Sequence, residues 1–227
     1  MLDGLLGYPF RGRGGVETLL LGGGLHLLAV YLPVVPYVVV LGYLLSVLVH
    51  TGADVHAGDH GAPAFLTYPP TLQQGTRLVV GGLRAVVVTA VYLALPVAML
   101  AVTVRGVGGL GELTATSGAV VTVGGTAALL AATVFAYPLP AALANTAHHR
   151  SLRAAFDTTL LWRAARDARY FVGWTTGVTA LLLGVAVARP LESVAVGFWA
   201  MFYAEVVAAA QWGWGVSRVL RDSQRSY

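Results

Sequence analysis

Four long runs of apolar residues dominate the pattern along this chain. They cover about 85–104, 118–144, 170–188 and 193–216. A helix needs roughly 20 apolar residues to cross a bilayer core of about 30 Å, so each run is long enough to span a membrane. The regular alternation of apolar and polar positions that is typical of a β-barrel does not occur. The pattern therefore predicts an all-α fold, an integral membrane helical bundle.

The first apolar region, residues 18–49, is too long for one crossing. As a single helix it would run about 48 Å, which a bilayer accommodates only with a steep tilt. Pro33 and Pro36 each remove a backbone donor and favour a break between them. The break predicts two spans, about 18–32 and 34–49, and six transmembrane helices in all. A single crossing here, giving five spans with the N-terminus outside, is the alternative.

Residues 148–169 are too polar to span a membrane. Leu152, Phe156 and Leu160 follow one another at four-residue steps and give the segment an apolar face. This predicts an interfacial helix before the fifth span, with a partner-docking surface as the alternative. Its basic residues are candidate contacts to lipid headgroups: Arg150, Arg153, Arg163, Arg166 and Arg169.

The distribution of arginine predicts the orientation. The basic segment before the fifth span and the tail containing Arg218, Arg221 and Arg225 both satisfy the positive-inside bias when they are cytoplasmic. With six crossings, both termini then lie in the cytoplasm. No basic segment precedes the first apolar residues, so we do not expect a signal peptide. Residues 1–227 form a single polytopic domain on this prediction.

Composition agrees with the membrane prediction and excludes several other classes. The chain is 57% hydrophobic and only 11% charged, whereas about a quarter of the residues are charged in a soluble domain. The formal net charge is +4 without a dense basic tract, so nucleic acid is not an expected partner. The absence of cysteine excludes disulfides, thiol nucleophiles and cysteine-based metal sites.

Several segments, in their order along the chain, carry a family resemblance. They are "YPFRGRGGVETLLLGGGLHLL", "VPYVVVLGYLLSVL", "RLVVGGLRAVVVTAVYLALPVAML" and "HRSLRAAFDTTLLWRAARDARYFVGW". Together they resemble the DUF4013 family of archaeal multi-pass membrane proteins of uncharacterised function. The resemblance implies the six-crossing fold and supplies no catalytic residues.

Glu205, near the middle of the last apolar run, is the main candidate for an intramembrane polar site. An ionisable group at membrane depth costs at least a few kcal/mol unless it is neutralised or paired. His26, Tyr92 and Asn145 also lie in apolar surroundings and are candidate partners. Two interpretations stay open: a pathway for ions or protons, and a protonated carboxyl that joins two helices by a hydrogen bond.

Small residues predict where helices pack closely. Gly173 and Gly177 form a GxxxG step, and Ala200, Ala204 and Ala208 repeat every four residues in the last span. Such faces let backbones approach one another where the hydrophobic effect provides no driving force. They fit packing within the chain as well as dimerisation.

The segment "HTGADVHAGDHG", residues 50–61, has the residue types of a metal site: His50, Asp54, His56, Asp59 and His60. A metal site also needs a scaffold that fixes the ligand geometry. The glycines of this segment provide none, so we expect a solvated loop and no metal site.

Two functional hypotheses follow. The first is an accessory or scaffold protein that packs against lipid, another integral membrane protein or a second copy of itself. The second is a small channel or transporter that uses Glu205 and proline-interrupted helices. No nucleotide-binding loop, nucleophile elbow or metalloprotease motif occurs, so we expect neither an enzyme nor a cofactor.

Overall fold

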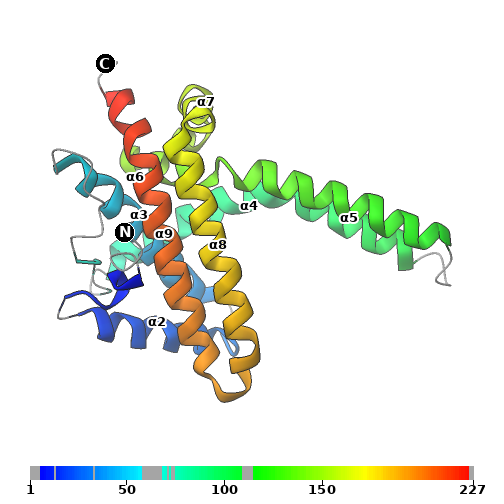
Figure 1. Ribbon diagram of the computed structural model, residues 1–227, viewed down its shortest axis with the longest axis horizontal. Helices are drawn as coiled ribbons and strands as arrows, with labels where there is room; N and C mark the ends of the chain where they lie inside the picture. The colour runs from blue at the N-terminus through cyan, green and yellow to red at the C-terminus, as the bar shows by residue number, and fades with distance from the viewer. Residues whose placement is uncertain are drawn as a thin grey trace.

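The computed structural model describes a helical protein. It covers residues 6–12, 14–32, 34–57, 68–70, 72, 75–108 and 115–224. No strand occurs in these ranges. A body of helices surrounds α9, and a long hairpin of two helices extends away from that body (Figure 1). The all-α prediction is confirmed.

The first apolar region is broken where the prolines predict a break. A short 3-10 turn, η1 (Tyr8–Phe10), precedes α2 (Gly15–Ala29), and α3 (Val34–Ala57) follows after a turn. Pro36 lies in the first turn of α3, where a backbone donor would have no intrahelical partner.

The helix α3 continues well past the predicted end at residue 49. Its C-terminal part includes His50, and the buried Thr51 hydroxyl donates to the carbonyl of Val47 at 2.8 Å. The prediction of a loop beginning at residue 50 was therefore wrong for residues 50–57. Packing explains the difference, because Thr51 lies against Gly213 of another helix. Residues 58–61 lie outside the described residues.

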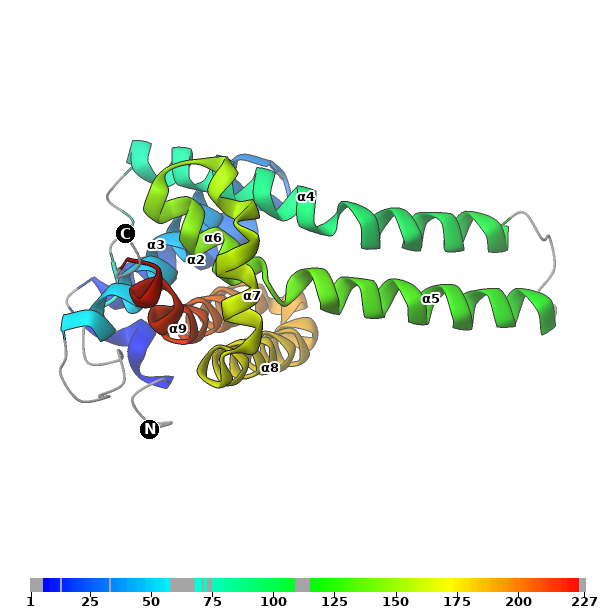
Figure 2. The same cartoon turned by 90° about the horizontal axis from the view of Figure 1, so that it is seen from above.

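The projecting hairpin consists of α4 (Gly75–Gly108) and α5 (Ala115–Ala136). With 34 residues, α4 is about 51 Å long at 1.5 Å per residue, and it begins ten residues before the predicted span. Its first half packs on α3 through Gly82, where a Cβ atom would overlap the carbonyl of Val38. Its second half packs on α5 and leaves the body (Figure 2).

The predicted span 118–144 is divided in two. The helix α5 ends at Ala136, and α6 (Leu139–His149) begins after Tyr137 and Pro138. Pro138 and Pro140 lack backbone donors, so the apolar stretch bends here and α6 turns into the body. Residues 148–169 also contain more than one element: the end of α6, η3 (Leu152–Phe156), α7 (Thr158–Arg166) and the start of α8.

The helices α8 (Ala168–Leu191) and α9 (Val196–Gln224) form an antiparallel pair joined by η4 (Glu192–Val194). The helix α9 also packs against α2, α3, α6 and α7. It is therefore the element around which the body is built.

Within the described residues, four segments are long and apolar enough to cross a membrane. They are Val34–Ala53, Gly75–Gly106, Val121–His149 and Ala168–Val194. The other two predicted spans differ. The helix α2 has only 15 residues, and Glu205 and Gln211 interrupt the apolar sequence of α9. The structure thus supports a bundle with four candidate spans, and it does not establish the count of six.

Candidate functional site

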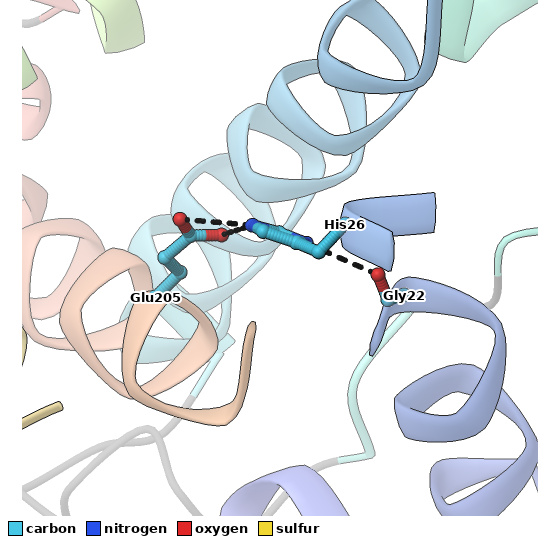
Figure 3. Close-up of polar contacts among 3 residues, drawn as sticks. All are labelled: Gly22, His26 and Glu205. Atoms are coloured by element: carbon cyan, nitrogen blue, oxygen red, sulfur yellow. Dashed lines mark hydrogen bonds and ion pairs between the residues drawn. The ribbon is translucent and has the colours of Figure 1, made fainter. Parts of the chain in front are cut away.

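Glu205 of α9 meets His26 of α2 inside the body. The Nε2 atom of His26 lies 3.2 Å from each carboxyl oxygen of Glu205. The side chains are 6% and 17% exposed. Figure 3 shows the imidazole edge directed at the carboxyl group, with the two helices on either side. Of the three partners proposed for Glu205, this is the one that the fold brings to it.

The other nitrogen of His26 fixes how protons are arranged in this contact. His26 Nδ1 lies 3.1 Å from the carbonyl oxygen of Gly22, and a carbonyl can only accept, so Nδ1 carries a hydrogen. Nε2 and the carboxyl group then hold one proton between them. The pair is either an imidazolium with a carboxylate or a neutral imidazole with a carboxylic acid, and both forms have zero net charge.

Glycine allows α2 to approach α9 closely enough for this contact. A Cβ atom on Gly22 would overlap the ring of Phe202, and one on Gly23 would overlap the ring of Trp199. Trp199 also donates from Nε1 to the carbonyl of Leu20 at 3.2 Å. The glycine run before His26 is thus part of the site, although the sequence pattern alone did not predict this role.

Aromatic rings cover the histidine. The ring of Phe202 lies 5.8 Å from that of His26, and the ring of Tyr37 meets it edge-on at 5.7 Å. These contacts limit access of water and strengthen the electrostatic interaction between imidazole and carboxyl group.

Tyr92 and Asn145 belong to a different polar contact. The Tyr92 hydroxyl donates to the carbonyl of Ala155 at 2.7 Å, and the Asn145 amide donates to the carbonyl of Ala154 at 2.8 Å. Both therefore hold η3 against α4 and α6. The structure separates them from Glu205.

The small residues singled out in the sequence lie between α8 and α9. A Cβ atom on Gly173 would crowd Gly215, and one on Gly177 would overlap the Trp212 ring. Ala204 faces Gly184, and Ala208 is fully buried. Ala200 lies beside a groove between the two helices. These contacts lie within one chain.

The arginines of the predicted interfacial segment are mostly at the surface. Arg150, Arg153, Arg163 and Arg166 are exposed, whereas Arg169 is half-buried. Arg169 stacks on Trp214 at 4.4 Å, and Arg166 stacks on Trp162 at 4.2 Å.

The structure describes the backbone of only the first part of the histidine-rich segment, residues 50–57. Asp59 and His60 lie outside the described residues, and His50 is on α3. Among the side chains that are described, no three histidine, aspartate or glutamate residues are grouped so that they could hold a metal ion.

These observations define a class: an α-helical protein with several helices apolar enough to cross a membrane and a buried histidine–carboxyl pair. The chain belongs to the family described as protein of unknown function (DUF4013), whose model matches residues 25–202. No curated protein and no solved structure matches it. The family resemblance noted in the sequence is confirmed.

Proposed function

We propose that this protein is a multi-pass membrane protein with an accessory or scaffold role, which binds another integral membrane protein through the α4–α5 hairpin. The observation that carries the proposal is the apolar surface of this hairpin. It extends from the body, and only 22% of the most apolar part of α4 is buried. A role of this kind requires no catalytic activity and no cofactor.

The surface of the hairpin is suited to another helix. Val102 and Val123 are each 71% exposed, and Leu130 is 63% exposed. The hairpin itself is well packed, since a Cβ atom on Gly124 would overlap the Thr103 side chain. Its outward face is therefore available without disturbing its own packing.

The direction of the hairpin supports a protein partner rather than lipid alone. The α4–α5 hairpin runs transverse to α8 and α9 in Figure 1, and Figure 2 views α8 and α9 nearly end-on while the hairpin still lies in the plane. Helices with such different directions cannot all follow the bilayer normal. A second membrane protein would cover the outward face of the hairpin.

Native mass spectrometry of the full chain, extracted in mild detergent from its own membrane, tests the proposal. We expect a second integral membrane protein in stoichiometric complex with the wild type. The hairpin variant V123S/L130S should lose that protein. The control variant L182S/V185S, which changes exposed apolar residues of α8, should retain it. Retention by the hairpin variant, or a wild-type chain without any partner, would contradict the proposal.

Proton-coupled transport is the second candidate function, and the His26–Glu205 pair favours it. A proton held between two titratable groups in an apolar setting is a feature of proton pathways. In proteoliposomes containing a pH-sensitive dye, E205Q should abolish proton flux while E17Q, which changes an exposed acid on α2, should not. A wild-type protein without measurable flux would exclude this candidate.

A further inference from the structure

A groove between α8 and α9 runs along the outside of the body. It encloses about 600 Å³, and its walls are mostly apolar. Val172, Leu183 and Val187 line it from α8, and Ala204, Val207 and Trp214 line it from α9. From Val172 to Val187 the groove extends about 22 Å at 1.5 Å per residue.

Both helix faces that line the groove end in arginine at the same end of the helix pair. On α8, Arg169 lies three residues before Val172. On α9, Arg218 and Arg221 lie four and seven residues after Trp214. Residues three, four and seven apart share one face of a helix. Because α8 and α9 are antiparallel, the three arginines lie at the same end of the helix pair, where Arg218 and Arg221 interact electrostatically with Arg169.

Arg169 is the innermost of the three. Its Nε atom is buried and has no hydrogen-bond partner in the described part of the chain. Its guanidinium lies over the ring of Trp214 at 4.4 Å, and Trp214 also forms part of the groove wall. The arginine cluster and the groove are thus parts of one site.

The cluster carries excess positive charge. Arg218 and Arg221 both interact electrostatically with Arg169, and Asp167 is the single carboxylate that offsets them among the described residues. Asp167 is itself engaged, since it accepts from the backbone N–H of Tyr170 at 2.9 Å and lies 3.9 Å from Arg218. Among the described side chains, three guanidinium groups therefore face one carboxylate, which leaves positive charge available to bind an anion.

We propose that this site binds one anionic membrane phospholipid, with its phosphate on Arg169, Arg218 and Arg221 and a hydrocarbon chain in the groove. Charge and shape together identify the ligand. Arginine binds phosphate through paired N–H donors. A hydrocarbon chain in one leaflet spans about 15 Å, half of the bilayer core of about 30 Å, and so fits within the groove. A free phosphate would use the arginines and leave the apolar groove without a role.

Lipid retention by the purified full chain tests the assignment. The protein in detergent is equilibrated with dioleoylphosphatidylglycerol, dioleoylphosphatidylcholine or inorganic phosphate, and bound species are counted by native mass spectrometry. We expect one retained phosphatidylglycerol per chain, weaker retention of phosphatidylcholine, and no displacement by inorganic phosphate.

Two pairs of variants test the contributions of the arginines and of the groove separately. R218Q/R221Q should weaken phosphatidylglycerol binding about thirtyfold, because each arginine near an anionic headgroup contributes about fivefold. T179W fills the groove and should also weaken phosphatidylglycerol binding. The matched controls R77Q/R105Q and T175W change exposed residues that do not line the groove, and both should bind as the wild type does.

The outcomes that overturn the assignment are distinct. Equal binding of both lipids, or unchanged binding by R218Q/R221Q, would show that the arginines do not select the ligand. Full displacement by inorganic phosphate together with an unaffected T179W would identify a free anion as the ligand instead. R218Q/R221Q changes residues near the helix end, and its helical content, measured by circular dichroism, serves as the check on folding.

Discussion

At the residue scale, the hydrogen bond between His26 Nε2 and Glu205 Oε1 pairs the two buried side chains. They are 179 positions apart in the chain, and neither has another described side chain as hydrogen-bond partner. Removing one of them therefore leaves the other buried and unsatisfied, which costs more than the hydrogen bond itself contributes.

The high cost of leaving one buried polar group without a partner gives a prediction for a double-mutant cycle. E205L should lower the free energy of unfolding by about 2 kcal/mol, because His26 Nε2 loses its partner in an apolar site. H26L/E205L should recover part of this loss, since both polar groups are then absent. Thermal unfolding of the wild type, H26L, E205L and H26L/E205L in the same detergent measures the coupling.

E205Q is the matched control within that cycle. Its amide can still donate to the Nε2 atom of a neutral imidazole, so we expect a smaller loss than for E205L. If the loss of stability in H26L/E205L equalled the sum of the losses in H26L and E205L, the pair would make no cooperative contribution.

At the element scale, the docking of α2 on α9 depends on which face of α2 carries glycine. Gly22 lies directly against the Phe202 ring, whereas a Cβ atom on Gly24 would have nothing within 4 Å. The two positions are in the same helix and two residues apart, which makes them a matched pair.

G22A should destabilise the protein by about 1–3 kcal/mol, because the ring of Phe202 must move out of a packed position. G24A should be neutral or stabilise by up to about 1 kcal/mol, since alanine is the better helix former. Unfolding in detergent compares them, and hydrogen exchange in α2 shows whether that helix loosens. Equal effects of the two substitutions would mean that α2 is not closely packed on α9.

The sequence predicts most of the helices but not all of their ends. Proline marks both a break that was predicted and a bend that was not. Pro33 and Pro36 correctly predict the break before α3. Pro138 and Pro140 lack backbone donors in the same way and lie where the predicted span 118–144 bends between α5 and α6.

Local sequence patterns do not determine which distant segments of the chain come into contact. Sequence alone placed His26, Tyr92 and Asn145 on equal terms as partners of Glu205, because nothing local determines which helix packs on α9. Likewise, Arg169 and the arginines of the C-terminal tail belong to separate predicted segments. Their meeting follows only from the antiparallel arrangement of α8 and α9.

At the scale of the whole molecule, the position of the arginine cluster at one end of α8 and α9 supports a specific orientation. We propose, from the positive-inside bias, that this end and both termini face the cytoplasm. Ser193, at the turn between the two helices, then faces outward, whereas Ser151 faces the cytoplasm.

The natural absence of cysteine makes this orientation directly measurable. In intact cells, a membrane-impermeant maleimide should label S193C and leave S151C unlabelled until the membrane is permeabilised. The wild type should show no labelling in either condition. Labelling of S151C in intact cells would reverse the proposed orientation.

The central place of α9 has a consequence for biogenesis. This helix contacts α2, α3, α6, α7 and α8, and all of them precede it in the chain. During synthesis these earlier helices emerge from the ribosome without the element that holds them together. His26 lacks its side-chain partner until Glu205 has been made. The contacts of α9 can therefore form only after residues 196–224 have been made, and we expect a chain truncated before residue 196 to expose unpacked helix faces to quality-control proteases.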